Sequence, residues 1–212
     1  MTDSYRTIAA PAEGEFKDRG SKFLAYAWPV RTEEEALAHL DWLRKEHFKA
    51  RHHCFAWRLA PDGSRFRAND DGEPSGTAGR PILGQIDSFG LTDVVVVVVR
   101  YFGGTLLGTS GLIQAYREAA AEALRTAKVE EKIVCDTFRF DFDYALMPDV
   151  MNAVKKLGLD IVHQDFGERG LLHLAIRQSE VADTLLKMKA LIRKISTEEA
   201  AGLDWPEGLT VD

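Results

Sequence analysis

The sequence predicts an α+β fold in two domains, at residues 1–130 and 133–200, followed by a tail at 201–212. Three observations support this prediction. Strand-like and helix-like hydrophobic patterns alternate in both parts of the chain. A short charged segment, Val129–Lys132, lies between them and reads as a linker. With 212 residues, the chain is long enough to bury two small cores.

The first elements are a strand pair and a helix. Residues 15–19 and 22–28 predict two strands that turn at Arg19-Gly20-Ser21. Thr32 and Glu35 form a capping-box pattern, which predicts a helix beginning there. Its inward face would carry residues at helical spacing, namely Ala36, Leu40, Leu43 and His47.

A hairpin follows the helix. His53–Leu59 predicts a strand, Pro61-Asp62-Gly63 has the residues of a tight turn, and Ser64–Asn69 returns antiparallel. Pairing across this turn would bring Asp70, Asp71 and Gly72 beside the neighbouring residues His52 and His53.

Two helices and a strand complete the first domain. Thr77–Phe89 predicts a helix that stops at Gly90. The valine run Val94–Val99 predicts a central strand covered on both faces. After a loop at 103–108, Thr109 or Ser110 would cap a helix that runs to about Ala127. The order ββαββαβα fits a sandwich with its helices on one face of a sheet.

The second domain begins with an alternating strand, in which Phe138, Phe140 and Phe142 are separated by charged residues. Further elements are predicted in the order helix, strand, strand, helix and edge strand, at Pro148–Leu157, Leu159–Phe166, Leu171–Arg177, Ser179–Leu191 and Ile192–Ser196. This βαββαβ order is the ferredoxin-like pattern. The chain from Glu198 onward is assigned no structure.

Composition excludes several classes. Hydrophobic content of 45% and charged content of 28% are ordinary for a globular protein, and the longest apolar run is far too short to cross a bilayer. The two cysteines, Cys54 and Cys135, show neither a disulfide framework nor zinc spacing. The first residues lack a signal-peptide pattern. We therefore expect a cytoplasmic protein with no membrane association, no metal and no cofactor.

Two glycine-rich blocks are the most informative feature of the chain. The first glycine block (69–80) reads N-D-D-G-E-P-S-G-T-A-G-R, and the second glycine block (100–116) reads R-Y-F-G-G-T-L-L-G-T-S-G-L-I-Q-A-Y. Glycines, hydroxyls and charges in such density favour sharp turns and close approach of a ligand. The two blocks therefore predict the location of a functional site.

Both blocks, together with R-H-H-C-F-A-W at residues 51–57, resemble the IMPACT family in its bacterial YigZ-like branch. The resemblance extends from about Lys17 to Ala127. It implies that residues 1–130 adopt the fold of the second domain of ribosomal protein S5. It also implies that residues 133–200 form the small ferredoxin-like domain of that branch, which is similar to RNA-proximal domains of elongation factor G.

The second glycine block links a buried strand to a helix start, where unpaired N–H groups and the helix dipole favour an anion. It lacks the lysine of a Walker A motif. Its glycines alternatively serve only to turn the chain. Arg100 would either bind phosphate or pair with Glu73 or Asp71. The anion-site candidates are Arg100, Gly103, Gly104, Thr105, Gly108, Thr109, Ser110 and Gly111.

The first glycine block defines a second set of candidates. Histidines beside carboxylates suit a metal or proton transfer, but no ligand spacing is present, and Asp71 also suits a structural turn. Glu73 is expected to be structural or to orient a ligand. Cys54 reads as a small buried hydrophobe. The candidates of this block and its neighbouring strand are His53, Asp71, Glu73, Ser75 and Thr77.

The charge distribution suggests a partner. The net charge is −6, yet the segment Arg44–Arg67 is strongly basic. A local basic face attracts phosphate even on an acidic protein, although it can also be simply a solvated surface. The RNA-contact candidates are Lys45, Lys49, Arg51 and Arg67.

These features favour a non-enzymatic protein that binds RNA or a translation-associated protein and regulates translation. No nucleophile, base and orienting group fall into a catalytic spacing, so no catalytic residue is assigned. The translational role is implied by the family resemblance. The alternative is an enzyme or sensor for a small phosphorylated ligand at residues 103–111. The sequence does not define the oligomeric state.

Overall fold

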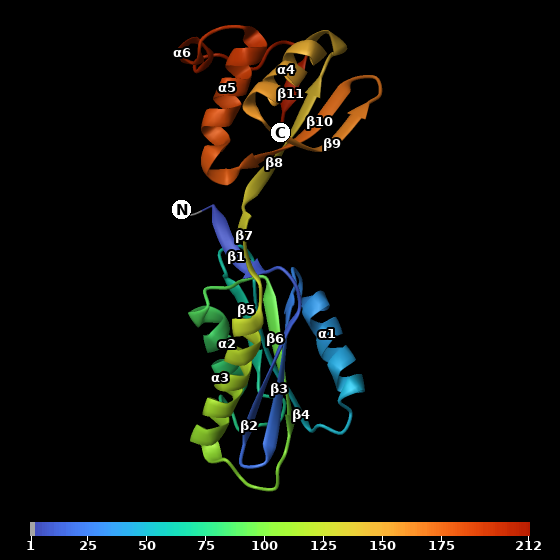
Figure 1. The fold of residues 1–212 in the computed structure, drawn as a ribbon. Helices are drawn as coiled ribbons and strands as arrows, with labels where there is room; N and C mark the ends of the chain where they lie inside the picture. The colour runs from blue at the N-terminus through green and yellow to red at the C-terminus, as the bar shows by residue number, and fades with distance from the viewer. Residues whose placement is uncertain (1–2) are drawn as a thin grey trace. The chain divides into compact units, whose positions relative to one another are not determined.

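The structure, a computed structural model, describes residues 3–212 and divides into two compact units (Figure 1). The first unit comprises Ser4–Lys132. The second unit comprises Ile133–Asp212 together with Asp3. We describe each unit by itself.

A five-stranded antiparallel sheet forms the centre of the first unit. Its middle strand contains the valine run, whose β-branched side chains suit a pleated, buried surface. In spatial order the strands are β2 (Ala12–Asp18), β3 (Ser21–Pro29), β6 (Val94–Tyr101), β4 (His52–Leu59) and β5 (Arg65–Asn69).

Helices cover both faces of this sheet, so the prediction of helices on one face was wrong (Figure 1). Helix α1 (Glu33–Glu46) packs on the face that carries Val95, Val97 and Val99. Helices α2 (Gly79–Ser88) and α3 (Gly108–Thr126) pack on the face with the alternate valines. The predicted burial of both faces of the valine strand is confirmed, and this burial is what requires two helical layers.

The two predicted helix starts had different outcomes. Thr32 caps α1, since its side chain accepts a hydrogen bond of 3.2 Å from the Glu35 N–H, and Ala36, Leu40 and Leu43 are buried as predicted. The predicted cap of α3 by Thr109 or Ser110 was wrong. The helix begins at Gly108, and no side chain among residues 3–212 caps its first turn. Buried Leu107 has already turned the chain before either hydroxyl is reached.

A two-stranded sheet joins β1 (Ser4–Ile8) to β7 (Val129–Ile133). The prediction that Val129–Lys132 is only a linker was therefore wrong. Val129 packs against the core of the first unit, while the charged residues that follow it are exposed or half-buried. The charges that suggested a linker are compatible with a strand because a two-stranded ribbon leaves much of its surface in water.

The second unit has a four-stranded antiparallel sheet in the order β11-β8-β10-β9. Its core contains Phe140, Phe142, Leu172, Leu174 and Met188. The elements in chain order are β8 (Cys135–Phe142), η1 (Tyr144–Leu146), α4 (Met147–Leu157), β9 (Asp160–Phe166), β10 (Gly170–Arg177), η2 (Gln178–Glu180), α5 (Val181–Arg193), α6 (Thr197–Ala200) and β11 (Leu209–Val211).

The last strand differs from the prediction. Residues 192–196 were expected to form an edge strand, but Ile192 is a buried position of α5, and Lys194 ends that helix in the left-handed conformation. The last strand is β11, which lies within the segment 201–212 that was assigned as a tail. Leu209 is 5% exposed and packs in the core, so this segment belongs to the second unit. None of the helices in residues 3–212 is long and apolar enough to span a membrane.

Candidate functional site

Asp70 holds the first glycine block in place. Its carboxylate accepts hydrogen bonds from the backbone N–H groups of Gly76 (2.8 Å), Ala78 (3.0 Å) and Gly79 (2.8 Å). Partial burial acts to raise the pKa of Asp70, but these N–H bonds outweigh it, and the pKa is lowered. The carboxylate thus fixes the loop. It also accepts hydrogen bonds from the N-terminus of α2, whose N-cap residue Ala78 has no side chain able to do so.

Asp71 joins the first glycine block to strand β4. Its Oδ2 accepts the backbone N–H of His53 at 2.7 Å, and its Oδ1 lies 3.2 Å from Arg44 Nη2. Its carbonyl oxygen lies 2.9 Å from His52 Nδ1. The prediction that the hairpin brings this block beside the two histidines is confirmed. Asp71 takes a positive φ of 40°, a conformation that Asp tolerates better than most residues.

Burial keeps two side chains of β4 in their uncharged form at neutral pH. His53 is 5% exposed, and burial lowers the pKa of its imidazole. Burial likewise raises the pKa of the Cys54 thiol, whose sulfur lies 3.0 Å from the Asp70 carbonyl oxygen. Cys54 therefore stays a protonated, buried thiol, as the sequence predicts.

Glu73 and Arg100 form a buried ion pair. Arg100 Nη1 lies 2.6 Å from Glu73 Oε1, and Tyr116 donates its hydroxyl to the same oxygen at 2.7 Å. The two charged side chains are 7% and 4% exposed. Of the two roles predicted for Arg100, the structure shows the ion pair. Burial raises the pKa of the Tyr116 phenol, so this group remains a neutral donor.

The Arg100 guanidinium also lies between aromatic rings. Its central carbon is 5.5 Å from the ring centroids of both Phe23 and Phe102. Its Nε is buried and has no hydrogen-bond partner within residues 3–212. An ion pair and two rings therefore fix this side chain while one of its donors remains unused.

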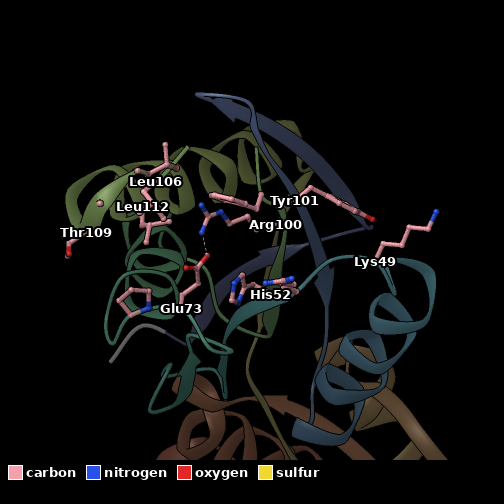
Figure 2. A pocket seen from close by; sticks show the side chains of 13 residues that line it. Lys49, His52, Glu73, Arg100, Tyr101, Leu106, Thr109 and Leu112 are labelled. Carbon is pink, nitrogen blue, oxygen red and sulfur yellow. Dashed lines mark hydrogen bonds and ion pairs between the residues drawn. The ribbon is translucent and has the colours of Figure 1, made fainter. Parts of the chain in front are cut away.

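A cavity of about 800 Å³ opens above this ion pair (Figure 2). Its lining is drawn from the segments 49–52, 73–74, 100–102 and 106–112. In Figure 2 the side chains of Glu73 and Arg100 meet, with Leu106, Thr109 and Leu112 on the side of α3 and Lys49 on the opposite side. Both glycine blocks thus contribute to one cavity.

The residues predicted in the second glycine block separate into two groups. Gly108 and Thr109 line the cavity together with Arg100. Gly103 instead packs tightly on the turn between β2 and β3, and its N–H donates to Ser21 Oγ at 3.1 Å. The remaining candidates, which are not among the lining residues, are Gly104, Thr105, Ser110 and Gly111.

The first glycine block contributes less to the cavity than the sequence suggests. Glu73 and Pro74 line it, whereas Asp71, Ser75 and Thr77 do not. The hydroxyl of Thr77 donates to the Pro74 carbonyl at 2.6 Å and so serves the loop itself. No cluster of three or more His, Cys, Asp or Glu side chains among the described residues is placed to hold a metal.

Only some of the predicted RNA-contact residues of the basic segment lie at the cavity. Lys49 and Arg51 line the cavity. Arg67 pairs with Glu33, and Lys45 lies on the last turn of α1 outside the lining. Sequence reasoning missed the apolar part of the cavity, which is formed by Phe102, Leu106, Leu107 and Leu112. The available signal was the presence of large apolar residues inside a glycine-rich loop.

Fold and site together define a class, an α+β protein of two units whose first unit has a cavity where two glycine-rich blocks meet. Residues 19–124 match the domain described as the Impact N-terminal domain. The chain is 34% identical to "IMPACT family member YigZ" of Escherichia coli (strain K12), over 88% of this chain and 92% of that protein. The chain therefore belongs to the IMPACT family, as the resemblance predicts.

The chain is also similar to two solved structures, and the first of them shares its fold over most of its length. A crystal structure described as that of a hypothetical protein matches with a TM-score of 0.71 and 33% identity, covering 91% of this chain and 95% of that one. A second structure, entitled as that of the two-domain translational regulator Yih1, is 34% identical over 57% of this chain and 47% of its own, with a TM-score of 0.35.

Proposed function

We propose that the first unit binds RNA at the cavity and that the protein regulates translation without catalysing a reaction. The observation that carries the proposal is the cationic rim of the cavity, where Lys49 and Arg51 lie around the same space as the first turn of α3. RNA presents a regular series of phosphates, and Lys and Arg are the side chains that bind them.

The charge balance of the cavity favours an anion. Glu73 is the one carboxylate among its described lining residues, and Arg100 neutralises it. Lys49 and Arg51 have no salt-bridge partner in the part of the chain that the structure describes. The cavity is therefore locally positive although the whole chain has a net charge of −6.

Helix α3 adds to this field. It has 19 residues, and its first two, Gly108 and Thr109, line the cavity. The first N–H groups of a helix have no intrahelical acceptor and carry the positive end of the helix dipole. A phosphate at this place would receive both the N–H groups and the charges of the two basic side chains.

The non-enzymatic part of the proposal rests on the side chains around the ion pair. The pKa values of Cys54 and Tyr116 are raised, so neither is a nucleophile at neutral pH. The carboxylate of Glu73 already accepts two hydrogen bonds. The translational role rests on membership of the IMPACT family together with the description of Yih1, which is 34% identical over 57% of this chain, as a translational regulator.

A second candidate is a small phosphorylated ligand. The cavity volume of about 800 Å³ lies within the range of pockets that bind small molecules, about 300–1,000 Å³. In this case the protein would be an enzyme or a sensor.

We also propose finer assignments of fold and location. The first unit, with helices on both faces of its sheet, would belong with the second domain of ribosomal protein S5. The second unit, with strand order β11-β8-β10-β9, would be ferredoxin-like. In this proposal the first domain ends near residue 130, and the protein acts in the cytoplasm.

The test is RNA binding at several salt concentrations, measured by fluorescence anisotropy with a labelled hairpin that has a single-stranded loop. The variant Lys49→Ala/Arg51→Ala should bind more weakly, and its plot of log K against log salt should flatten by about 0.7–0.9 for each phosphate that is no longer neutralised. Lys155→Ala/Lys156→Ala removes the same charge from the second unit and should leave the affinity and the salt slope unchanged. Equal weakening in the two variants, or no RNA binding by the wild type at low salt, would contradict the proposal.

A further inference from the structure

We propose that the cavity takes one unstacked nucleotide, with its base against the ring of Phe102 and its phosphate toward Lys49 and Arg51. The ligand would accordingly be single-stranded RNA rather than a duplex. This inference rests on the proposed phosphate binding and specifies what the rest of the ligand must be.

The first argument is an exposed aromatic ring at the cavity. Phe102 is 55% exposed, although it lies in a loop that also holds charged and buried groups. The Arg100 guanidinium lies 5.5 Å from its ring centroid, and Arg100 is itself held by Glu73. The ring is therefore supported by a fixed group while more than half of the residue remains open to a ligand. Bases stack on such rings whatever their sequence.

The second argument is the apolar wall. Leu107 and Leu112 are buried at 7% and 6% exposure, whereas Leu106 is 82% exposed. All three line the same cavity as the basic residues. A ligand that fills this space needs an apolar face next to an anionic group. A nucleotide has both, whereas inorganic phosphate lacks the apolar face.

The third argument is an unused donor. Arg100 lines the cavity, its side chain is 7% exposed, and its Nε has no hydrogen-bond partner among residues 3–212. Arg100 therefore keeps hydrogen-bonding capacity that its ion pair with Glu73 does not use. Base carbonyls, ring nitrogens and phosphate oxygens are all acceptors that guanidinium groups bind.

The shape of the cavity separates single strands from duplexes. A space of about 800 Å³ holds a nucleotide but no stack of base pairs. In an A-form duplex the base faces are covered by their neighbours, so they cannot reach an aromatic ring inside a cavity. Only a loop, an end or a single strand can present an unstacked base.

The experiment uses the full chain and three probes: a labelled eight-nucleotide single-stranded RNA, the same RNA annealed to its complement, and adenosine 5′-monophosphate as a competitor. Phe102→Ala should weaken single-strand binding about 10-fold or more, because stacking of a base contributes roughly that much. Phe102→Trp should restore binding. Phe102→Leu keeps the apolar contact with Arg100 but lacks the π face, so it should bind as poorly as the alanine variant.

Phe66→Ala is the matched control. Phe66 is 57% exposed, and the guanidinium of Arg58 lies 5.0 Å from its ring centroid, but it lines no part of this cavity. Its removal should leave binding unchanged. Circular dichroism of every variant verifies that the fold is retained.

The outcomes separate the two proposals. If Phe102→Ala binds RNA as the wild type does while Lys49→Ala/Arg51→Ala does not, stacking is wrong and phosphate binding stands. If the duplex binds as tightly as the single strand, the single-strand inference is overturned. If adenosine 5′-monophosphate binds as tightly as the RNA and loses affinity in Phe102→Ala, the nucleotide site is supported, but its source is a free nucleotide and the RNA assignment is overturned.

Discussion

The two glycine blocks have similar compositions, but their loops use polar groups in different ways. In the first glycine block, Asp70 accepts three backbone N–H groups, Thr77 bonds to the loop, and Glu73 is buried in an ion pair. In the second glycine block, Arg100 and Tyr116 bond to Glu73, but Gly104, Thr105 and Leu106 are exposed in a loop that opens on the cavity.

The difference shows that glycine and polar residues in a short span have two distinct uses. They can complete a loop whose polar groups satisfy one another, which makes a rigid support. They can also leave backbone groups unsatisfied at a helix start, which makes a surface ready for a ligand. Here the first glycine block supports the ion pair under the cavity, and the second glycine block forms part of its wall.

Removal of the Asp70 carboxylate should have the largest effect. Asp70→Ala leaves three N–H groups without their acceptor, so the free energy of unfolding should fall by about 4 kcal/mol. Urea denaturation followed by tryptophan fluorescence in a Trp205→Phe background reports on the first unit, which contains Trp28, Trp42 and Trp57. Asp62→Ala removes a carboxylate that accepts one N–H in an exposed turn and should cost under about 1 kcal/mol. Similar destabilisation by Asp70→Ala and Asp62→Ala would contradict the claim that Asp70 makes the first glycine block a rigid support.

Neighbouring glycines in the second glycine block should respond unequally. A Cβ on Gly103 would overlap the backbone of Gly20 and Ser21, which cannot move aside cheaply, so Gly103→Ala should destabilise by about 3 kcal/mol. Gly104 has a φ of 86°, but no atom of the described chain lies within 4 Å of a Cβ built there. Gly104→Ala should therefore cost only about 1 kcal/mol, from backbone strain. Thermal unfolding of both variants measures the difference.

Acidification should weaken the support around the first glycine block. Burial lowers the pKa of folded His53, and Arg44 and His47 act in the same direction while Asp71 opposes them. Because the unfolded chain takes up this proton first, the stability that neutral His53 contributes is complete above about pH 6.5 and is lost as pH falls through the folded pKa. The midpoint of thermal unfolding should fall less steeply between pH 6.5 and 5 in His53→Gln than in the wild type. An identical slope in both proteins would show that His53 is not a source of the pH dependence. His163→Gln, at an exposed position, serves as the control.

The smallest effect is expected at the start of α3. Thr109→Ala should change the free energy of unfolding by less than about 0.5 kcal/mol, because no side-chain cap is removed within the described chain. Thr32→Ala removes a real cap of α1 and should cost about 1 kcal/mol. Chemical denaturation of the two variants side by side tests whether the second glycine block depends on side-chain capping.

Much of the fold could be predicted because its patterns are local. Thr32, Glu35 and the apolar stripe of α1 specify that helix within one stretch of sequence. The position of the last strand could not be predicted, because Ile192 and Leu209 are equally apolar. What distinguishes them is that Ile192 continues the buried stripe of α5, while Leu209 pairs with Phe142 across the sheet.

The sequence locates the site, but it does not show which of the candidate residues line the cavity and which are paired elsewhere. The sequence indicates that the glycine blocks meet, because both follow strands of one sheet. It does not reveal that Arg67 is paired with Glu33 while Lys49 and Arg51 line the cavity, because such pairings depend on contacts between distant segments. For the same reason, the contact between Phe102 and Arg100 could not be predicted from the sequence.

Asp3 has a consequence for the order in which the protein forms. Its carboxylate pairs with Arg177 and accepts a hydrogen bond from Ser179, and its carbonyl accepts the N–H of Val134. On the ribosome, Asp3 is synthesised long before these partners. The second unit therefore includes a residue that is synthesised before the whole first unit. During synthesis, the first unit can complete its five-stranded sheet early. The contacts of Asp3 in the second unit form only after Val134, Arg177 and Ser179 have been synthesised.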